Sequence, residues 1–285
     1  MTDAGVTIQN GVVYAKHDGV ELLGDLYLPK NAKAETAKAV PALVAVHGGG
    51  WVAGVRSAMQ YWGPFLAARG IAVFAVSYRL AAKEKTFPQA VQDVLAGVQF
   101  VRGKASAFGI DPARIGLLGA SAGAHLAALA ALSGKKFVGA YPHDAFASVD
   151  AGVKALVGVY GIYDVTAMWT AYQLQGGRDN NIQKFLGAPP MEDRPLYFDA
   201  SPLSYATFAN NPIGVFLVTG TEDDLVDRKA QTEPFQLALK QAGFFVRPCI
   251  VPGAPHYWMN DPIEEPGSYT GFLAPRLLRF LAERL

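Results

Sequence analysis

A serine between two glycines is the arrangement in this sequence with the clearest capacity for chemistry. Ser121 lies at the centre of the pentapeptide GASAG at 119–123, between the apolar run 115–118 and the Ala-rich run 122–132. A serine hydroxyl is a poor nucleophile, so an enzyme that uses one holds it on a sharp turn beside a base. Small residues two positions before and after the serine allow a strand and a helix to approach closely enough for that turn. The alternative is a glycine-rich turn with an inert serine.

A base for Ser121 must come from one of the five histidines of the chain. Ligands of open α/β sheets collect at the carboxyl ends of the strands. His256 follows the last predicted strand, and it alone also satisfies the chain order serine, acid, histidine. His125 lies four residues after Ser121 on the same predicted helix, so we expect it to pack against or support the site.

An acidic loop precedes that histidine in the sequence. The segment 221–227 follows a predicted strand and contains four carboxylates, at Glu222, Asp223, Asp224 and Asp227. A carboxylate here would accept the Nδ1 proton of His256 and stabilise the imidazolium that forms in the reaction. Spacing leaves the choice between Asp223 and Asp224 open, while Asp227 also suits the cap of a helix predicted to begin near Lys229.

A glycine run at the end of another predicted strand suits the stabilisation of an oxyanion. The pentapeptide HGGGW occupies 47–51. Glycine leaves backbone N–H groups uncovered, so two of them can point at one oxygen, and the N–H of Ala122 at a helix start would supply another. A phosphate-binding loop is the competing interpretation, but neither a Gly-x-Gly-x-x-Gly spacing nor a Gly-Lys-Ser/Thr ending is present. We expect His47 to be a structural hydrogen-bonding residue beneath this loop.

Aromatic residues in or near the predicted site loops suggest an apolar pocket for a small to medium acyl or aryl group. They are Trp51, Tyr163, Trp169, Tyr172 and Trp258, with Met259 beside them. Ordinary packing is an equally good explanation for each one singly. The sequence contains no His-x-x-x-His, His-Glu-x-x-His or cysteine-pair motif, so neither a metal nor another cofactor is expected.

The elements that must position these residues alternate between strand and helix from residue 41 onward. An antiparallel hairpin over 12–16 and 21–28 comes first, followed by βα repeats, which predicts an α/β fold with a mostly parallel eight-stranded sheet flanked by helices. The remaining strands are expected at 41–47, 71–78, 115–118, 155–160, 213–219 and 244–251, and the helices at 57–69, 88–108, 122–132, 229–242 and 269–285. The segment 163–211 is longer than an ordinary connection, so we expect a cap inserted in a single domain spanning 1–285.

Composition excludes several classes of protein. The 285 residues are 51% hydrophobic, and 25 basic side chains balance 24 acidic ones without a long basic run, which argues against a nucleic-acid-binding surface. The single cysteine, Cys249, lies in an apolar run and is expected in the core. No apolar run reaches the ~18 residues of a membrane helix, and 1–10 do not read as a secretory signal, so a cytoplasmic protein without a membrane partner is expected. An edge strand or the last helix would offer a surface for a homodimer.

These motifs together resemble the α/β-hydrolase superfamily, specifically esterases related to hormone-sensitive lipase and the bacterial feruloyl/acetyl esterases. The matching segments follow the family's order: HGGGW at 47–51, SYRLA at 77–81 with FPQA at 87–90, GASAG at 119–123, Ser201-Pro202, GTED at 220–223 and Pro255-His256. The resemblance implies Asp223 as the catalytic acid and N–H donors from Gly49, Gly50 and Ala122. Which N–H groups of 48–50 act as donors stays open.

The resemblance also implies a function. Ala120 stands where many hormone-sensitive-lipase relatives have Asp, and only about 40 residues precede the first central strand, which favours the feruloyl/acetyl-esterase and kynurenine-formamidase side. The expected activity is hydrolysis of small-molecule carboxylic esters through Ser121, His256 and Asp223. The first alternative is an amide or formamide hydrolase with the same three residues. The second is a non-catalytic ligand-binding homologue.

Overall fold

The computed structural model describes residues 5–30, 39–176 and 180–285. Over these residues eight strands form one sheet in the order β1-β2-β4-β3-β5-β6-β7-β8. The first two strands are antiparallel to their neighbours, and the pairs from β4-β3 to β7-β8 are parallel. This confirms the predicted opening hairpin and mostly parallel sheet. The strands are β1 Val6–His17, β2 Val20–Pro29, β3 Val40–Val46, β4 Ala72–Val76, β5 Ile110–Ala120, β6 Ala155–Val159, β7 Gly214–Gly220 and β8 Phe245–Val251.

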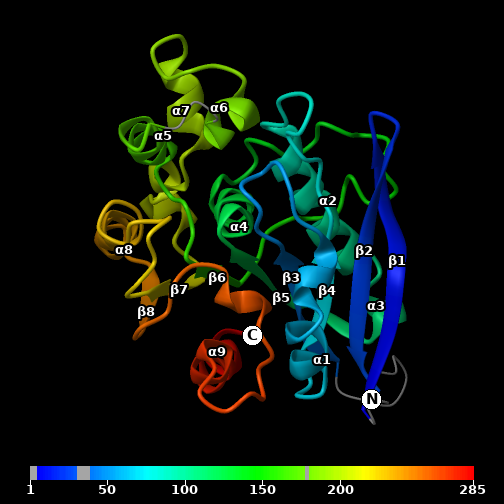
Figure 1. Cartoon of the computed structure of the whole chain (residues 1–285). Coiled ribbons are helices and arrows are strands. Elements are labelled where there is room, and N and C mark those ends of the chain that lie inside the picture. Colours follow the sequence, from blue (N-terminus) through cyan, green and yellow to red (C-terminus); the bar gives the residue numbers. More distant parts are fainter. Residues whose placement is uncertain (1–4, 31–38, 177–179) are drawn as a thin grey trace.

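Helices cover both faces of the sheet (Figure 1). One hydrophobic core includes residues of α2, α4 and α8, and a second core on the other face includes residues of α1 and α9. The helices are α1 Trp62–Ala67, α2 Gln89–Gly103, α3 Ala105–Phe108, α4 Ala122–Leu132, α5 Val165–Leu174, α6 Asn181–Leu186, α7 Arg194–Ala200, α8 Thr232–Gln241 and α9 Tyr269–Arg284. None of these described helices has the length and apolar character that crossing a bilayer would require.

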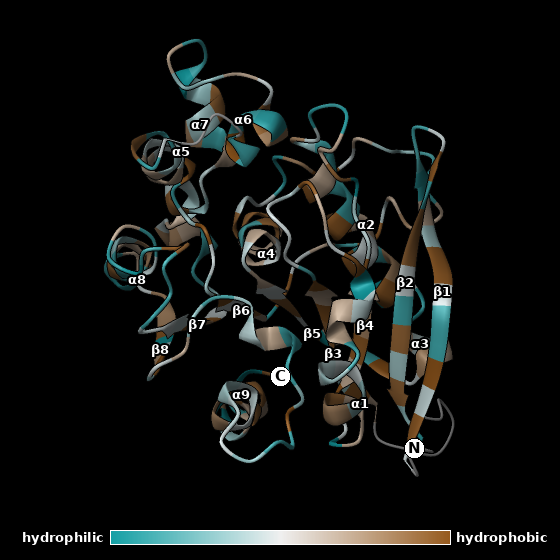
Figure 2. Cartoon of the chain, viewed as in Figure 1, coloured by the Kyte–Doolittle hydropathy of each residue, from teal (hydrophilic) through white to brown (hydrophobic). Residues whose placement is uncertain are grey.

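The central strands are buried on both faces because successive side chains point to opposite sides of a strand. In β3, Val44 and Val46 belong to the first core and Leu43 and Ala45 to the second. Cys249 on β8 is buried in the second core, as predicted. The outer hairpin differs: Figure 2 shows hydrophobic and hydrophilic residues alternating along β1 and β2. Such alternation is typical of strands with one face in water.

The helix predicted over 57–69 is wrong. The chain instead forms a 3-10 turn at Arg56–Met59 and then α1. Pro64 explains the break, because a helix continuing through this position would lose the N–H that bonds the carbonyl of Gln60. Starting at Trp62 places the proline within the first turn, where no such bond is needed. The helix predicted over 88–108 is likewise divided, at Lys104, into α2 and α3.

The segment 163–211 contains three helices that the sequence analysis did not resolve. Side chains of Asp164, Asn180 and Asp193 accept hydrogen bonds from the first backbone N–H groups of α5, α6 and α7. Such N-caps are a local signal that was available in the sequence. The three helices lie together at one end of the molecule (Figure 1).

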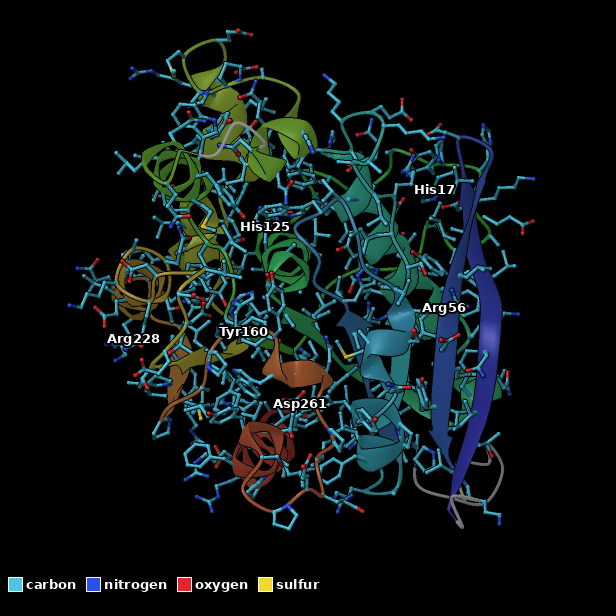
Figure 3. All side chains as sticks on the ribbon, in the orientation of Figure 1. His17, Arg56, His125, Tyr160, Arg228 and Asp261 are labelled. Carbon is cyan, nitrogen blue, oxygen red and sulfur yellow. The ribbon has the colours of Figure 1, made fainter. Side chains whose placement is uncertain are left out.

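A buried histidine joins the outer hairpin to the rest of the fold. His17, at the end of β1, is 1% exposed and is labelled beside the hairpin in Figure 3. Its Nδ1 lies 2.7 Å from Oδ1 of Asp93 on α2, and its Nε2 lies 2.7 Å from Oδ2 of Asp144. Arg79 also binds Asp93, with Nη2 2.7 Å from Oδ1. Since only a protonated imidazole donates from both nitrogens, the two carboxylates favour the imidazolium.

The pKa of His17 follows from two opposing effects. Burial lowers it, but the hydrogen bonds to Asp93 and Asp144 outweigh burial and raise the pKa above its ordinary value of 6.5. The charged form is therefore bound more tightly in the folded chain than in the unfolded one. This stabilisation is fully present below the unfolded pKa and is lost as pH rises through the folded pKa.

We predict that His17→Gln lowers the free energy of unfolding by about 1.5–3 kcal/mol at pH 6, the usual magnitude for hydrogen bonds to charged groups, and by less at pH 9. Urea unfolding at the two pH values measures the difference. The exposed His143 lies in the same region, and His143→Gln is the matched control. A destabilisation by His17→Gln that is independent of pH would contradict the charged-histidine interpretation.

Candidate active site

Ser121 occupies a strained turn between β5 and α4. Its backbone has φ 54° and ψ −125°, a conformation that residues with a side chain rarely adopt. A Cβ at Gly119 would lie 2.3 Å from the carbonyl oxygen of Gly123, and a Cβ at Gly123 would lie 2.2 Å from that of Val46. Neither position has room for a side chain. The two glycines flanking the serine are therefore required by backbone contacts.

His256 and Asp223 complete a chain of hydrogen bonds that begins at Ser121. Nε2 of His256 lies 3.0 Å from Oγ of Ser121, and its Nδ1 lies 2.8 Å from Oδ2 of Asp223. The side chains of His256 and Asp223 are each 3% exposed. The three residues follow the carboxyl ends of β5, β7 and β8, where a parallel sheet collects its ligand-binding residues.

The carboxylates of the acidic loop differ in their hydrogen-bond partners. Oδ1 of Asp223 accepts hydrogen bonds from the N–H groups of Leu225 and Val226, at 3.1 and 2.9 Å, which leaves Oδ2 directed to the histidine. Asp224 is exposed and has no hydrogen-bond partner within the described part of the chain. Asp227 accepts from the N–H of Lys229, but α8 begins only at Thr232. Asp227 therefore caps a turn ahead of the helix and not the helix itself, which corrects the predicted helix start.

The glycine run passes directly against the serine. A Cβ at Gly48 would lie 3.2 Å from Cβ of Ser121. Gly49 and Gly50 have φ values of 122° and 59°, and their N–H groups bond to no acceptor in the described ranges. The N–H of Ala122, at the first position of α4, has no acceptor within its own helix. Two N–H groups of the glycine run and one at the start of α4 are therefore without an acceptor in the described part of the chain.

Two further histidines hold this loop in place. His47 donates from Nδ1 to the carbonyl oxygen of Gly48 at 2.7 Å and stacks on Tyr78, which is the structural role predicted for it. His125 is fully buried; its Nδ1 accepts from Nε1 of Trp51 at 3.0 Å, and its Nε2 donates to the carbonyl oxygen of Ala200 at 2.8 Å. Burial lowers the pKa of His125 to about 4, which keeps it neutral and preserves both bonds. It supports the site without facing the serine turn, as expected.

The cavity beside Ser121 differs from the predicted aromatic pocket. It has a volume of about 210 Å³, and its lining includes Gly49, Met59, Tyr160, Tyr257 and Asn260. The predicted pocket residues are not part of this lining; they are Trp51, Tyr163, Trp169 and Trp258. Within the described residues, three of them are packed side chains instead, at 1% exposure for Trp51 and Tyr163 and 2% for Trp258.

Long-range packing explains this difference. Trp51 stacks on Phe185 of α6, and Tyr163 stacks on Phe235 of α8. Trp169 is half-buried and packs against the first core. Tyr160 and Tyr257 were not among the predicted pocket residues, although each had a local signal. Tyr160 is the last residue of the strand predicted over 155–160, and Tyr257 is the neighbour of His256 in the chain.

Backbone strain is concentrated at this cavity. Five non-glycine residues of the described chain have positive φ angles: Asp18, Trp51, Ser121, Tyr160 and Tyr257. Three of them, Ser121, Tyr160 and Tyr257, line the cavity, and Trp51 ends the glycine run beside it. Strained conformations persist only where the surrounding structure enforces them, and they are typical of functional sites.

The sequence profile of the BD-FAE family matches residues 24–239 of this chain. The chain belongs to the BD-FAE family. The matched region begins within β2 and ends within α8; it contains the glycine run, Ser121 and Asp223, and ends before His256.

Curated relatives of this BD-FAE member include two esterases of Mycobacterium tuberculosis. Esterase LipQ is 31% identical over 207 residues, which cover 71% of this chain and 46% of LipQ. Esterase LipC is 31% identical over 253 residues, which cover 86% of this chain and 58% of LipC. The chain thus spans about half the length of these relatives.

Solved structures establish the fold class. Esterase 2 of Thermogutta terrifontis with bound butyrate superimposes with a TM-score of 0.77 at 23% identity, covering 99% of this chain and 95% of that one. The bifunctional GH43-CE protein of Bacteroides eggerthii gives a TM-score of 0.78 at 23% identity, covering 99% of this chain and 38% of that one. The predicted α/β-hydrolase fold and the family resemblance are confirmed.

Within 5–30, 39–176 and 180–285, no three histidine, cysteine, aspartate or glutamate side chains lie close enough together to hold a metal ion. A serine held by an imidazole, itself oriented by a buried carboxylate, is an arrangement that raises the nucleophilicity of the hydroxyl.

We predict that Asp223→Asn slows covalent labelling of Ser121 by a fluorophosphonate at least 100-fold, since an amide stabilises the wrong tautomer of His256. The neighbouring Asp224→Asn, at an exposed carboxylate, is the matched control and should react within twofold of the unaltered protein. Intact-mass spectrometry over time gives both rates. Equal rates for the two variants, or the reverse order, would reject the assignment of Asp223.

Proposed function

We propose that this protein is a carboxylic ester hydrolase in which Ser121 is the nucleophile, His256 the base and Asp223 the residue that orients the base. The observation that carries the proposal is the hydrogen-bond chain from Oγ of Ser121 through both ring nitrogens of His256 to Asp223, with distances of 3.0 and 2.8 Å. An intact chain of this kind also argues against a non-catalytic ligand-binding homologue.

Each residue then has a defined role in a two-step reaction. His256 takes the proton of Ser121 as Oγ attacks the ester carbonyl, and Asp223 stabilises the resulting imidazolium. The N–H groups of Gly49, Gly50 and Ala122 hold the negative oxygen of the tetrahedral intermediate, and each is worth roughly 100- to 1000-fold in turnover. His256 next protonates the departing alcohol, after which a water molecule removes the acyl group by the same path in reverse.

The cavity and the relatives support a small-molecule ester as the substrate. A volume of about 210 Å³ beside the serine suits a small to medium group. LipQ and LipC are named as esterases, which favours an ester over the amide or formamide that the same three residues also allow. Turnover of an aryl acetate compared with that of N-formylkynurenine separates these two substrate classes.

We further propose that the segment 163–211 is a cap built into a single domain spanning 1–285. Contacts with the glycine run support this assignment. A Cβ at Gly50 would lie 2.7 Å from Nδ2 of Asn181 on α6, and Phe185 of the same helix stacks on Trp51. The cytoplasmic location and the homodimer stay predictions from the sequence.

We predict that Ser121→Ala abolishes hydrolysis of p-nitrophenyl acetate, because the variant lacks the hydroxyl that lies 3.0 Å from Nε2 of His256 and would attack the ester. Release of p-nitrophenol measures the activity, and urea unfolding of the variant serves as the control for correct folding. Activity within a few-fold of the unaltered protein in the folded variant would refute the mechanism.

A further inference from the structure

The imidazole of His256 is in contact with two tyrosine rings. The centroid of Tyr160 lies 4.4 Å from that of His256 with an interplanar angle of 50°, and that of Tyr257 lies 4.6 Å away at 86°. Both tyrosines line the cavity that contains Ser121. They differ in exposure, at 3% for Tyr160 and 61% for Tyr257, so the two rings have different roles.

Tyr160 is held from several directions. Its hydroxyl oxygen accepts a hydrogen bond from the N–H of Met259 at 3.2 Å, and its ring packs edge-on against Trp258. Figure 3 places Tyr160 in the interior of the molecule near α4, between the labels of His125 and Asp261. Tyr160 is therefore a rigid support for the imidazole.

Tyr257 lacks such support. Its hydroxyl has no hydrogen-bond partner among the residues that the structure describes, and its only ring contact there is with His256. Its backbone has φ 70°, in the left-handed region, which costs a residue with a Cβ about 1–2 kcal/mol relative to a right-handed conformation. Glycine would adopt this conformation without that cost. An exposed aromatic residue with a strained backbone thus lies beside the proposed base, and its ring contact with His256 adds little to the stability of the fold.

The reaction geometry identifies what this ring would contact. Nε2 of His256 faces Oγ of Ser121 and is also the atom that protonates the departing oxygen of an ester. The alcohol part of the substrate must therefore lie next to His256, whereas the carbonyl oxygen lies toward the N–H groups of Gly49 and Gly50. Tyr257 packs on the imidazole and lines the same cavity, so it borders the space for the alcohol.

We propose that Tyr257 determines leaving-group specificity by forming an aromatic wall for the alcohol part of the ester, and that the site favours esters of aromatic alcohols. The inference rests on the proposed ester hydrolase function. A flat aromatic alcohol can pack against the exposed tyrosine ring while its oxygen stays within reach of His256. A short aliphatic alcohol such as methanol leaves that ring without a contact.

The test compares phenyl acetate with methyl acetate in the variants Tyr257→Ala and Tyr257→Phe. Because an aromatic pair is worth about 0.5–1.5 kcal/mol, Tyr257→Ala should lower kcat/KM for phenyl acetate by about 3- to 10-fold. The loss for methyl acetate should stay below twofold. Tyr257→Phe keeps the ring and should retain the preference of the unaltered protein.

Hydrolysis of the acetyl-enzyme, measured in single turnover, provides a readout that a purely structural role would change. Both substrates form the same acetyl-enzyme, and the alcohol has already left, so a leaving-group wall does not affect this step. Its rate should therefore stay within twofold in Tyr257→Ala. Equal losses in all three measurements would show that the ring only supports His256, and an unchanged kcat/KM for phenyl acetate would likewise overturn the proposal.

A third variant controls for backbone strain. Tyr257→Gly removes the ring and also the cost of positive φ, so it should unfold at a urea concentration no lower than Tyr257→Ala and show the same loss of preference. Failure of the proposed function is distinguishable from failure of this inference. If the proposed function is wrong, the unaltered protein will hydrolyse neither acetate in a Ser121-dependent manner.

Discussion

Close backbone packing between the start of α4 and the end of β3 is the constraint on which the rest of the site depends. The Cα of Gly123 lies so near the carbonyl oxygens of Val46 and His47 that no side chain fits between them. This contact forces the turn at Ser121 and brings the glycine run that follows His47 against the serine. One packing requirement thus places the proposed nucleophile and its proposed oxyanion donors side by side.

The parallel sheet supplies the other two residues. Because parallel strands end at the same edge, loops far apart in the chain converge there. The loops after β7 and β8 bring Asp223 and His256 to the serine, although these residues lie 102 and 135 positions after Ser121 in the sequence. His256 then forms a direct hydrogen bond with Ser121. Backbone N–H groups of the acidic loop then hold the carboxylate of Asp223, so the orientation of His256 depends on a folded loop and not on a flexible side chain.

The helices over the site act on it through polar and aromatic contacts. Trp51, within the glycine run, is held between Phe185 of α6 and the buried imidazole of His125, which in turn bonds the end of α7. His125 can serve in this way only while neutral, and its burial ensures that state. Substitutions in α6 or α7 would therefore reach the proposed oxyanion donors without touching substrate. The outer hairpin is joined to the fold separately, by the pairing of β2 with β4 and by the hydrogen bonds of the buried His17.

Local patterns in the sequence were sufficient for the order of the strands and for the position of the serine turn, but not for the three helices of 163–211. The strands and the serine turn depend on residues close together in the chain, where periodicity, glycine and proline have direct consequences. The choice of Asp223 over Asp224 from the residues alone was not possible, because adjacent carboxylates differ only in which backbone N–H groups fold around them. Family resemblance selected the same residue.

The aromatic residues show most clearly where local information ends. Trp51, Tyr163 and Trp258 were reasonable pocket residues from their positions, but each is buried against partners contributed by distant elements. Tyr160 and Tyr257 line the cavity and contact the ring of His256, and both have positive φ angles that their residue types do not predict. Motif spacing determines which groups can react, whereas the direction of a side chain depends on contacts made only when distant segments pack together.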